Sequence, residues 1–226
     1  MVQKNVEKKS LSENLGDFIL RNLRVIFVFC GVLLLGAVCA VVVISVNEKT
    51  IEKGLGKIDL ISYELTNKSY DLSETEIAAR QDKAVSSLSE LVGKSGIVGV
   101  RANMLSAEIY YQKKDFENAR SAWLAAAQKG KNTYIAPIAF FNAASCSEEL
   151  GNLDDAAAGY KSASEVEDFY EAAHALFSLG RVQEAKEDFV AAAASYQALV
   201  DKSPEDSWAK LAKNRLVSLK ISGKVE

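Results

Sequence analysis

The stretch that decides the fold is FENARSAWLAA at residues 116–126, because its pattern returns as LDDAAAGYKSA at 153–163 and as FVAAAASYQAL at 189–199. Each copy has a small residue three positions after an aromatic residue or leucine, and an aromatic residue four positions later. The small residue recurs after 37 and then 36 residues, at Ala119, Ala156 and Ala192. Such spacing indicates a repeated helical unit.

A second helix is predicted upstream of each copy. About a dozen residues before each alanine, an apolar helical stripe carries another small residue, namely Ala107, Ala144 and Gly180. Turn-forming residues at 113–115 and 151–152 separate the two helices of a unit. Small side chains let helices approach to about 8–10 Å. We expect large side chains to fill the space between one pair and the next, at Trp123, Tyr160 and Tyr196.

This pattern resembles the tetratricopeptide repeat family over residues 97–206 and, more weakly, over residues 73–95. The resemblance implies an all-α fold, a tetratricopeptide-like solenoid of helical hairpins. The sequence departs from the family pattern at Asn103, where the first helix often has tryptophan, and at Gln183, where tyrosine is common. Pro204 stops the last repeat and starts a closing helix.

A separate apolar run, VIFVFCGVLLLGAVCAVVVISV, occupies residues 25–46 and contains no charged side chain. As a helix rising about 1.5 Å per residue, it is long enough to cross the hydrocarbon core of a bilayer. A buried globular helix is one alternative, but apolarity on every face favours a single transmembrane helix. A cleaved signal peptide is another, which the length of the run and the 24 residues before it disfavour.

Cations are more numerous before the apolar run than directly after it. Five precede it: Lys4, Lys8, Lys9, Arg21 and Arg24. Three follow it: Lys49, Lys53 and Lys57. Because cytoplasmic flanks of membrane helices are enriched in lysine and arginine, we expect a cytoplasmic N-terminus. The protein is then single-pass in an inner (plasma) membrane, with a periplasmic or otherwise extracytoplasmic repeat domain.

These observations divide the chain into five predicted regions. Ser73 and Glu76 form the sequence signature of a capping box at the start of a helix. Gly54 and Gly56 weaken the preceding helix and suggest a hinge. The regions are a cytoplasmic segment (1–24), a transmembrane helix (25–46), a helical linker with a degenerate first repeat (47–96), tetratricopeptide-like repeats (97–206) and a C-terminal capping helix with a tail (207–226).

The composition argues against catalysis and against metal or cofactor binding. The 226 residues include one histidine, His174, three cysteines and two prolines, which excludes a Cys/His zinc cluster. No glycine-rich loop has the lysine and threonine that would cradle a phosphate. The net charge of −3 argues against a general nucleic-acid binder. We therefore expect no enzyme, no cofactor, no metal site and no nucleic-acid partner.

The candidate binding site is a concave groove lined by the first helix of each pair. An apolar and aromatic floor with mixed charges suits a partner peptide or helix, with Tyr111, Phe141 and Phe177 as anchors. An equally weighted alternative is that these aromatic rings only pack between repeats. The predicted groove residues are Arg101, Met104, Glu108, Tyr111, Ile138, Phe141, Ser145, Glu148, His174, Phe177 and Arg181.

The layout of a short cytoplasmic segment, one span and a soluble repeat domain resembles the YfgM-like family of inner-membrane proteins. The resemblance implies an ancillary subunit of the Sec translocon with a chaperone-like periplasmic domain. The expected partners are other proteins, such as translocon components or exported clients, and the sequence makes no prediction of oligomeric state. The alternative function is a structural adaptor for cell-envelope assembly or division machinery.

Overall fold

The computed structural model describes residues 11–226, so Lys4, Lys8 and Lys9 of the predicted cytoplasmic segment lie outside the described residues. Within this described part every regular element is a helix and none is a strand. The chain divides into a first unit that ends at Glu52 and a second unit, Lys53–Glu226. The prediction of an all-α helical-repeat fold is confirmed.

The first unit contains α1 (Leu11–Arg21) and the beginning of α2 (Leu23–Thr66). Between them, the side-chain amide of Asn22 donates a hydrogen bond of 2.9 Å to the carbonyl of Phe18. Among the described helices, α2 is the one long and apolar enough to cross a membrane, by length and composition. None of its apolar window is buried within the described part of the chain. A signal sequence also meets these criteria of length and apolar composition.

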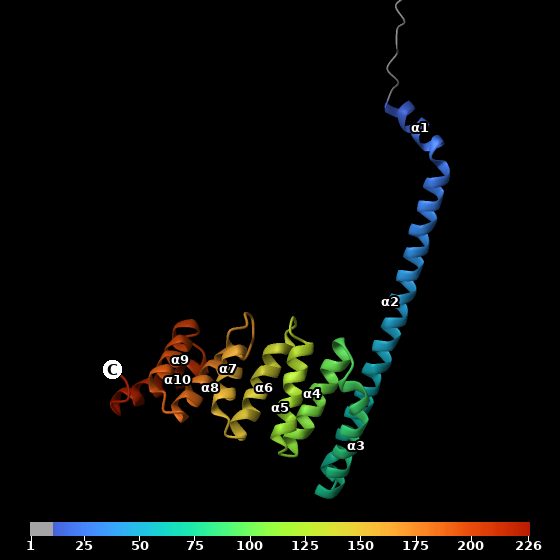
Figure 1. Cartoon of the computed structure of the whole chain (residues 1–226). Helices are drawn as coiled ribbons and strands as arrows, with labels where there is room; N and C mark the ends of the chain where they lie inside the picture. Colours follow the sequence, from blue (N-terminus) through green and yellow to red (C-terminus); the bar gives the residue numbers. More distant parts are fainter. Residues whose placement is uncertain (1–10) are drawn as a thin grey trace, which may run out of the picture. The chain divides into compact units, whose positions relative to one another are not determined.

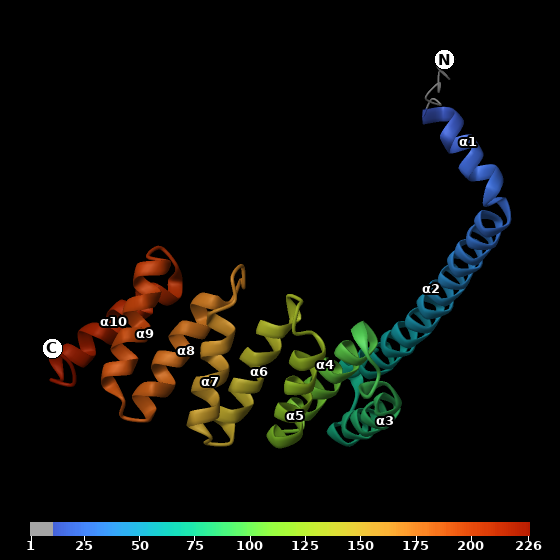
Figure 2. The ribbon, with the colours of Figure 1, turned by 45° about the horizontal axis from the view of Figure 1, so that its top comes forward.

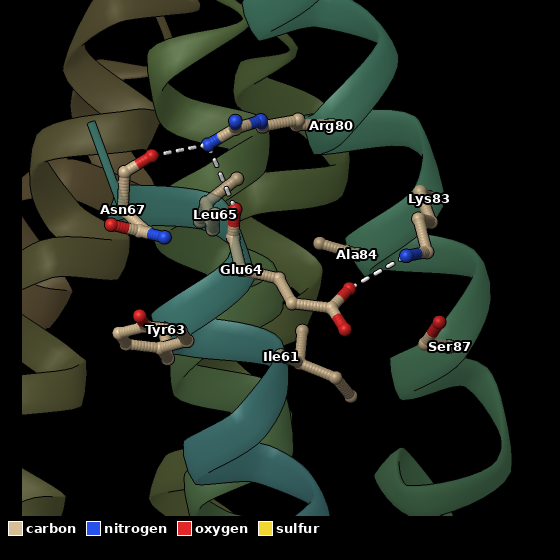
Figure 3. A pocket seen from close by; sticks show the side chains of 9 residues that line it. All are labelled: Ile61, Tyr63, Glu64, Leu65, Asn67, Arg80, Lys83, Ala84 and Ser87. Carbon is tan, nitrogen blue, oxygen red and sulfur yellow. Dashed lines mark hydrogen bonds and ion pairs between the residues drawn. The ribbon is translucent and has the colours of Figure 1, made fainter. Parts of the chain in front are cut away.

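The second unit begins with the last part of α2, which pairs with α3 (Glu74–Val92) through the 3-10 turn Ser69–Asp71. The predicted capping box is confirmed, since the backbone N–H of Ser73 donates to Glu76 Oε2 at 2.9 Å and Ser73 Oγ accepts from Glu76 N at 3.4 Å. Arg80 donates to the backbone carbonyls of Glu64 and Asn67 at 3.0 and 2.6 Å, across an open pocket of ≈ 300 Å³ (Figure 3). The guanidinium thus satisfies carbonyls at the end of α2 that have no partner within the helix.

The hinge expected at Gly54 and Gly56 stays a prediction, and the boundary between the two units, after Glu52, falls beside Gly54. Helix α2 runs unbroken through both residues. Gly54 is buried, and a Cβ atom there would lie 2.8 Å from the methyl carbons of Val98. The absence of a side chain at Gly54 therefore permits close packing between α2 and α4 (Gly96–Gln112).

From α3 onward, successive helices pack side by side in chain order and make a row of antiparallel hairpins (Figures 1 and 2). The closing helix packs against α9 and also reaches α8. Its start after Pro204 matches the sequence prediction. After α4, the elements are α5 (Phe116–Lys129), α6 (Ile135–Glu149), α7 (Leu153–Ser164), α8 (Ala172–Ala185), α9 (Phe189–Lys202) and α10 (Ser207–Ile221).

The small residues that define the repeat are buried inside the hairpins. The exposed fraction is zero at Ala119, Ala156 and Ala192. At Gly180, an added Cβ would lie 2.5 Å from the ring of Tyr196, so only glycine fits beneath that ring. Trp123 packs against alanines of both α4 and α6, as expected of a side chain that fills the space between hairpins.

Three tight turns within the hairpins share one backbone conformation. Lys114, Gly151 and Glu187 all have positive φ, at 59°, 75° and 61°. The residue after each is the N-cap of the next helix, and the carboxylates of Asp115 and Asp188 accept backbone N–H groups at 3.3 and 3.1 Å. The third turn, residues 186–188, was not predicted, although its sequence Lys-Glu-Asp has the same form as Lys-Lys-Asp at residues 113–115.

Asn103, which stands where the family often has tryptophan, is buried, and its side-chain amide group is hydrogen-bonded. Its side-chain amide donates to the carbonyls of Val92 and Gly99 at 2.8 and 2.7 Å. Val92 ends α3, so the asparagine ties the end of one helix to the body of the next. A polar side chain therefore replaces a large apolar one without leaving a buried group unsatisfied.

Cys146 lies in the core between the first two complete hairpins. Its exposed fraction is zero, and it belongs to the cluster formed around Trp123 and Ala107. Burial raises the pKa of the Cys146 thiol to about 11. The residue thus acts as a small apolar side chain, as the sequence suggested.

Ala156→Leu should destabilise the solenoid by about 1–3 kcal/mol, because the added carbons have no space between α6 and α7. Ala156 is fully buried, whereas Ala158 lies on the same helix and is exposed. The matched control is therefore Ala158→Leu, which should change little. Thermal unfolding of the full-length chain, followed by circular dichroism, measures both; equal midpoints would contradict the assigned register.

Candidate functional site

The residues predicted to line the groove all lie on the first helices of the hairpins, and we call this set the first-helix face. On α4 it comprises Arg101, Met104, Glu108 and Tyr111. On α6 it comprises Ile138, Phe141, Ser145 and Glu148. On α8 it comprises His174, Phe177 and Arg181. Three of these side chains are exposed and the remainder are half-buried, the exposed ones being Glu108, Tyr111 and Arg181.

The α6 and α8 parts of the face are joined by ring contacts. Phe141 packs edge-to-face on Tyr160 with ring centroids 5.3 Å apart, and its other neighbour is His174 at 4.8 Å. Tyr160 belongs to α7 and His174 to α8. Phe141 therefore contributes to packing both within its own hairpin and between hairpins.

Trp208 of α10 extends this series of ring contacts, and its place in the series was not predicted from the sequence. Its indole stacks on His174 with centroids 3.9 Å apart and an interplanar angle of 4°. It also lies 5.2 Å from Phe177, which in turn lies 5.6 Å from Tyr196. The capping helix thus covers part of the α8 segment of the face with one side chain.

A charged cluster holds the α6 and α8 segments together. Glu148 accepts hydrogen bonds from the Tyr160 hydroxyl at 3.1 Å and from Arg181, whose Nη2 atom is 2.8 Å away. The hydrogen bond from Arg181 lowers the pKa of Glu148. Burial and the neighbouring carboxylate raise the pKa of the Tyr160 hydroxyl. Two residues predicted as groove charges are thus each other's ion-pair partners.

The same cluster recurs one repeat later. Glu184 accepts from the Tyr196 hydroxyl at 2.7 Å and from Arg215 Nε at 2.9 Å. Burial opposes ionisation of Glu184, but these hydrogen bonds outweigh it and lower the pKa. The sequence carries a signal that was missed, since a glutamate stands 12 residues before the tyrosine in both repeats.

The α4 segment of the face is more open. The Tyr111 side chain is 39% exposed, and its ring contact is with Phe116 of α5 at 5.3 Å, not with Phe141. Glu108 retains contact with solvent, while partial burial raises the pKa of its carboxyl. Arg101 pairs with Asp59 at 2.8 Å. This segment combines accessible aromatic and apolar surface with charge.

An apolar pocket of ≈ 390 Å³ lies between the loops that precede α6 and α8. Tyr134 and Tyr170, one on each loop, are both 77% exposed. Ile138 connects the pocket to the first-helix face, because it contributes to both. The two tyrosines are 36 residues apart and thus occupy matching positions in consecutive repeats.

Among residues 11–226, no group of three or more histidine, cysteine, aspartate or glutamate side chains is placed to hold a metal ion. His174 Nδ1 lies 2.9 Å from Glu171 Oε2, and its ring is stacked on Trp208. These contacts give the histidine a packing role at the end of the aromatic row.

The tetratricopeptide repeat family model matches residues 78–135 and 148–207. The first match covers most of α3 with α4 and α5, and the second covers α7, α8 and α9. The chain belongs to the tetratricopeptide repeat family. The repeats of this family are protein-interaction modules.

A relative from Treponema pallidum (strain Nichols), described as a TPR repeat-containing protein, is 32% identical over 152 residues. The alignment covers 66% of this chain and 64% of the relative, so the chain spans less than two thirds of the relative's length. The likeness agrees with the repeat architecture described above.

Glu148→Gln should remove a pH-dependent part of the stability. Because the folded-state pKa of Glu148 is lowered, its contribution is present above the ordinary value of 4.5 and is lost as the pH falls through the folded value. We expect a loss on the order of 1 kcal/mol at neutral pH, limited by solvent screening at the half-exposed Arg181.

Urea unfolding of the parent and Glu148→Gln chains, measured across the acid range, tests this difference. It should be largest at neutral pH and shrink below pH 4.5. The neighbouring exposed residue gives the matched control Glu149→Gln. A difference that did not depend on pH would show that the charge of Glu148 is unimportant.

Proposed function

We propose that this chain is a membrane-anchored protein-binding module. The apolar part of α2 supports the anchor, since its side chains at residues 27–46 are all exposed and have no protein surface to bury them. Exposed apolar side chains over such a length are stable in a bilayer and not in water. The cation bias of the flanks supports a cytoplasmic N-terminus and an extracytoplasmic solenoid.

The observation that carries the binding function is the open α4 segment of the first-helix face. Tyr111 is accessible and Met104 is half-buried on the same helix. Glu108 and Arg101 carry opposite charges there, and Arg101 is paired with Asp59. Aromatic and methionine side chains in such a setting are typical anchors for a partner segment. Phe141 and Phe177 differ, because the ring of Phe141 already contacts His174 of the next hairpin and the ring of Phe177 already contacts Trp208 of the closing helix.

The binding role proposed for this module is assistance to protein export. The order of a cytoplasmic segment, a span and a repeat domain resembles that of the YfgM-like family, in which the repeat domain is chaperone-like and ancillary to the Sec translocon. An exported client would present an extended apolar segment on the far side of the inner membrane. The α4 segment of the first-helix face combines apolar and charged side chains, which suits the binding of an extended peptide of this kind.

A structural adaptor for envelope machinery is the second candidate, and a specific observation favours it. The pocket between the loops before α6 and α8 is flanked by Tyr134 and Tyr170, which are the most exposed tyrosines of the complete hairpins. Two exposed aromatic rings beside an apolar pocket suit a side chain of a folded partner. Stoichiometric binding of one folded protein there would favour the adaptor.

The membrane anchor predicts that the full-length chain stays with membranes after extraction at alkaline pH. Leu34→Arg places a charge in the middle of the apolar run and should release a substantial fraction, because a central arginine costs about 2.5–3.5 kcal/mol on insertion scales. Lys53→Arg, outside the run, is the control and should behave like the parent. Complete extraction of the parent chain would contradict the anchor.

Partner binding at the α4 segment is tested by photo-crosslinking in native membranes. A photoreactive residue replaces Tyr111 in one variant and Leu124 in another; Leu124 is exposed to a similar extent, 38%, but lies on the second helix α5. We expect crosslinked proteins from position 111 at several times the yield from position 124. Equal yields would overturn the assignment of the face.

The crosslinked species distinguish the two candidate functions. Many exported proteins attached at position 111 support the export role. A single stoichiometric protein, attached from position 134 or 170 in place of 111, supports the adaptor. Position 170 is chosen because Tyr170 is exposed, so substitution there should not disturb the core.

A further inference from the structure

Helix α1 has an apolar face that the rest of the described chain leaves uncovered. Leu15 and Phe18 are 60% and 61% exposed, and Ile19 is 41% exposed. With 100° between successive residues of a helix, these three lie on one side of α1. In the sequence, charged residues recur at every fourth position, at 13, 17 and 21, a spacing that is typical of the polar side of an amphipathic helix. The helix is therefore amphipathic.

The position of α1 in the chain indicates what covers this face. One residue, Asn22, separates α1 from α2, and the apolar run begins at Val25. Asn22 hydrogen-bonds back to Phe18, and the axis of α1 turns away from that of α2 at this point (Figures 1 and 2). Eleven residues that include several charges are too few and too polar to span a bilayer.

We propose that α1 is an in-plane helix that lies on the bilayer surface, with Leu15, Phe18 and Ile19 inserted at the boundary between headgroups and acyl chains. This inference rests on the proposed membrane span. A helix that is directly continuous with a span is held at the membrane surface, where burying its apolar face in lipid is favourable. Arg21 and Arg24 flank the break and face the anionic headgroups at the entry of the span.

A position in the membrane plane also determines the relative depths of Leu15 and Leu20. Leu20 is 74% exposed and lies away from the face formed by Leu15 and Phe18. A helix that continued the axis of the span would carry Leu20 deeper than Leu15, since Leu20 is nearer to α2. A helix in the plane of the membrane reverses this order, and the two leucines therefore report its orientation.

The test uses full-length protein in vesicles of phosphatidylcholine and phosphatidylglycerol that contain brominated lipid. Tryptophan is introduced in three separate variants, Leu15→Trp, Leu20→Trp and Leu34→Trp. The parent chain supplies the background from Trp123 and Trp208. Leu15→Trp and Leu20→Trp are matched, because both replace an exposed leucine of the same helix.

For α1 in the membrane plane, lipids brominated near the headgroups quench Leu15→Trp at least about twofold more than Leu20→Trp. Leu34→Trp is quenched most by lipids brominated near the acyl ends. Equal quenching of the first two variants, stronger quenching of Leu20→Trp, or no quenching of Leu15→Trp overturns the in-plane helix, the last result indicating a protein partner or a second copy on this face. If Leu34→Trp is the one variant that is not quenched, the membrane span itself is overturned, and the placement of α1 in the membrane plane loses its basis.

Discussion

The distance between the helices of this solenoid is set by residues that have almost no side chain. Ala119, Ala156 and Ala192 are completely buried, and Gly180 accepts the ring of Tyr196 where a methyl group would clash. Once backbones approach this closely, large rings can pack across them and bridge to the next hairpin. The ring contacts, the charged clusters and the exposure of the first-helix face all follow from that spacing.

Charged links then connect each hairpin to the next. Arg120 of α5 donates to Ser147 at 2.8 Å and to Asp155 at 2.6 Å, while Lys186 pairs with Asp154. The clusters around Glu148 and Glu184 add buried hydroxyl groups to the same kind of link. Because these contacts join neighbouring hairpins, each interface is stabilised locally, and the order of helices determines which side chains share the first-helix face.

Much of the fold could be predicted from the sequence because its determinants are local and periodic. The alanine spacing, the capping box at Ser73 and the turn at Gly151 each depend on residues close together in the chain. The contact of Gly54 with Val98 could not be predicted, because the two residues come from different helices and a glycine in a helix has no local signal for its packing partner. Trp208 escaped prediction for the same reason, since its stacking on His174 depends on how the closing helix folds back.

The sequence predicted which helices carry the residues of the candidate site, but not which contacts those side chains make with one another. Helical spacing alone placed its residues on the first helices, yet it gave no sign that Glu148 and Arg181 neutralise each other or that Phe141 is held between two rings.

The burial of Cys146 has a consequence for the reactivity of its thiol. With its pKa near 11, roughly one thiol in ten thousand is ionised at neutral pH, and the thiolate is the species that attacks disulfides. Burial therefore makes this sulfur a poor nucleophile in two ways, because it keeps the thiol protonated and removes it from contact with solvent.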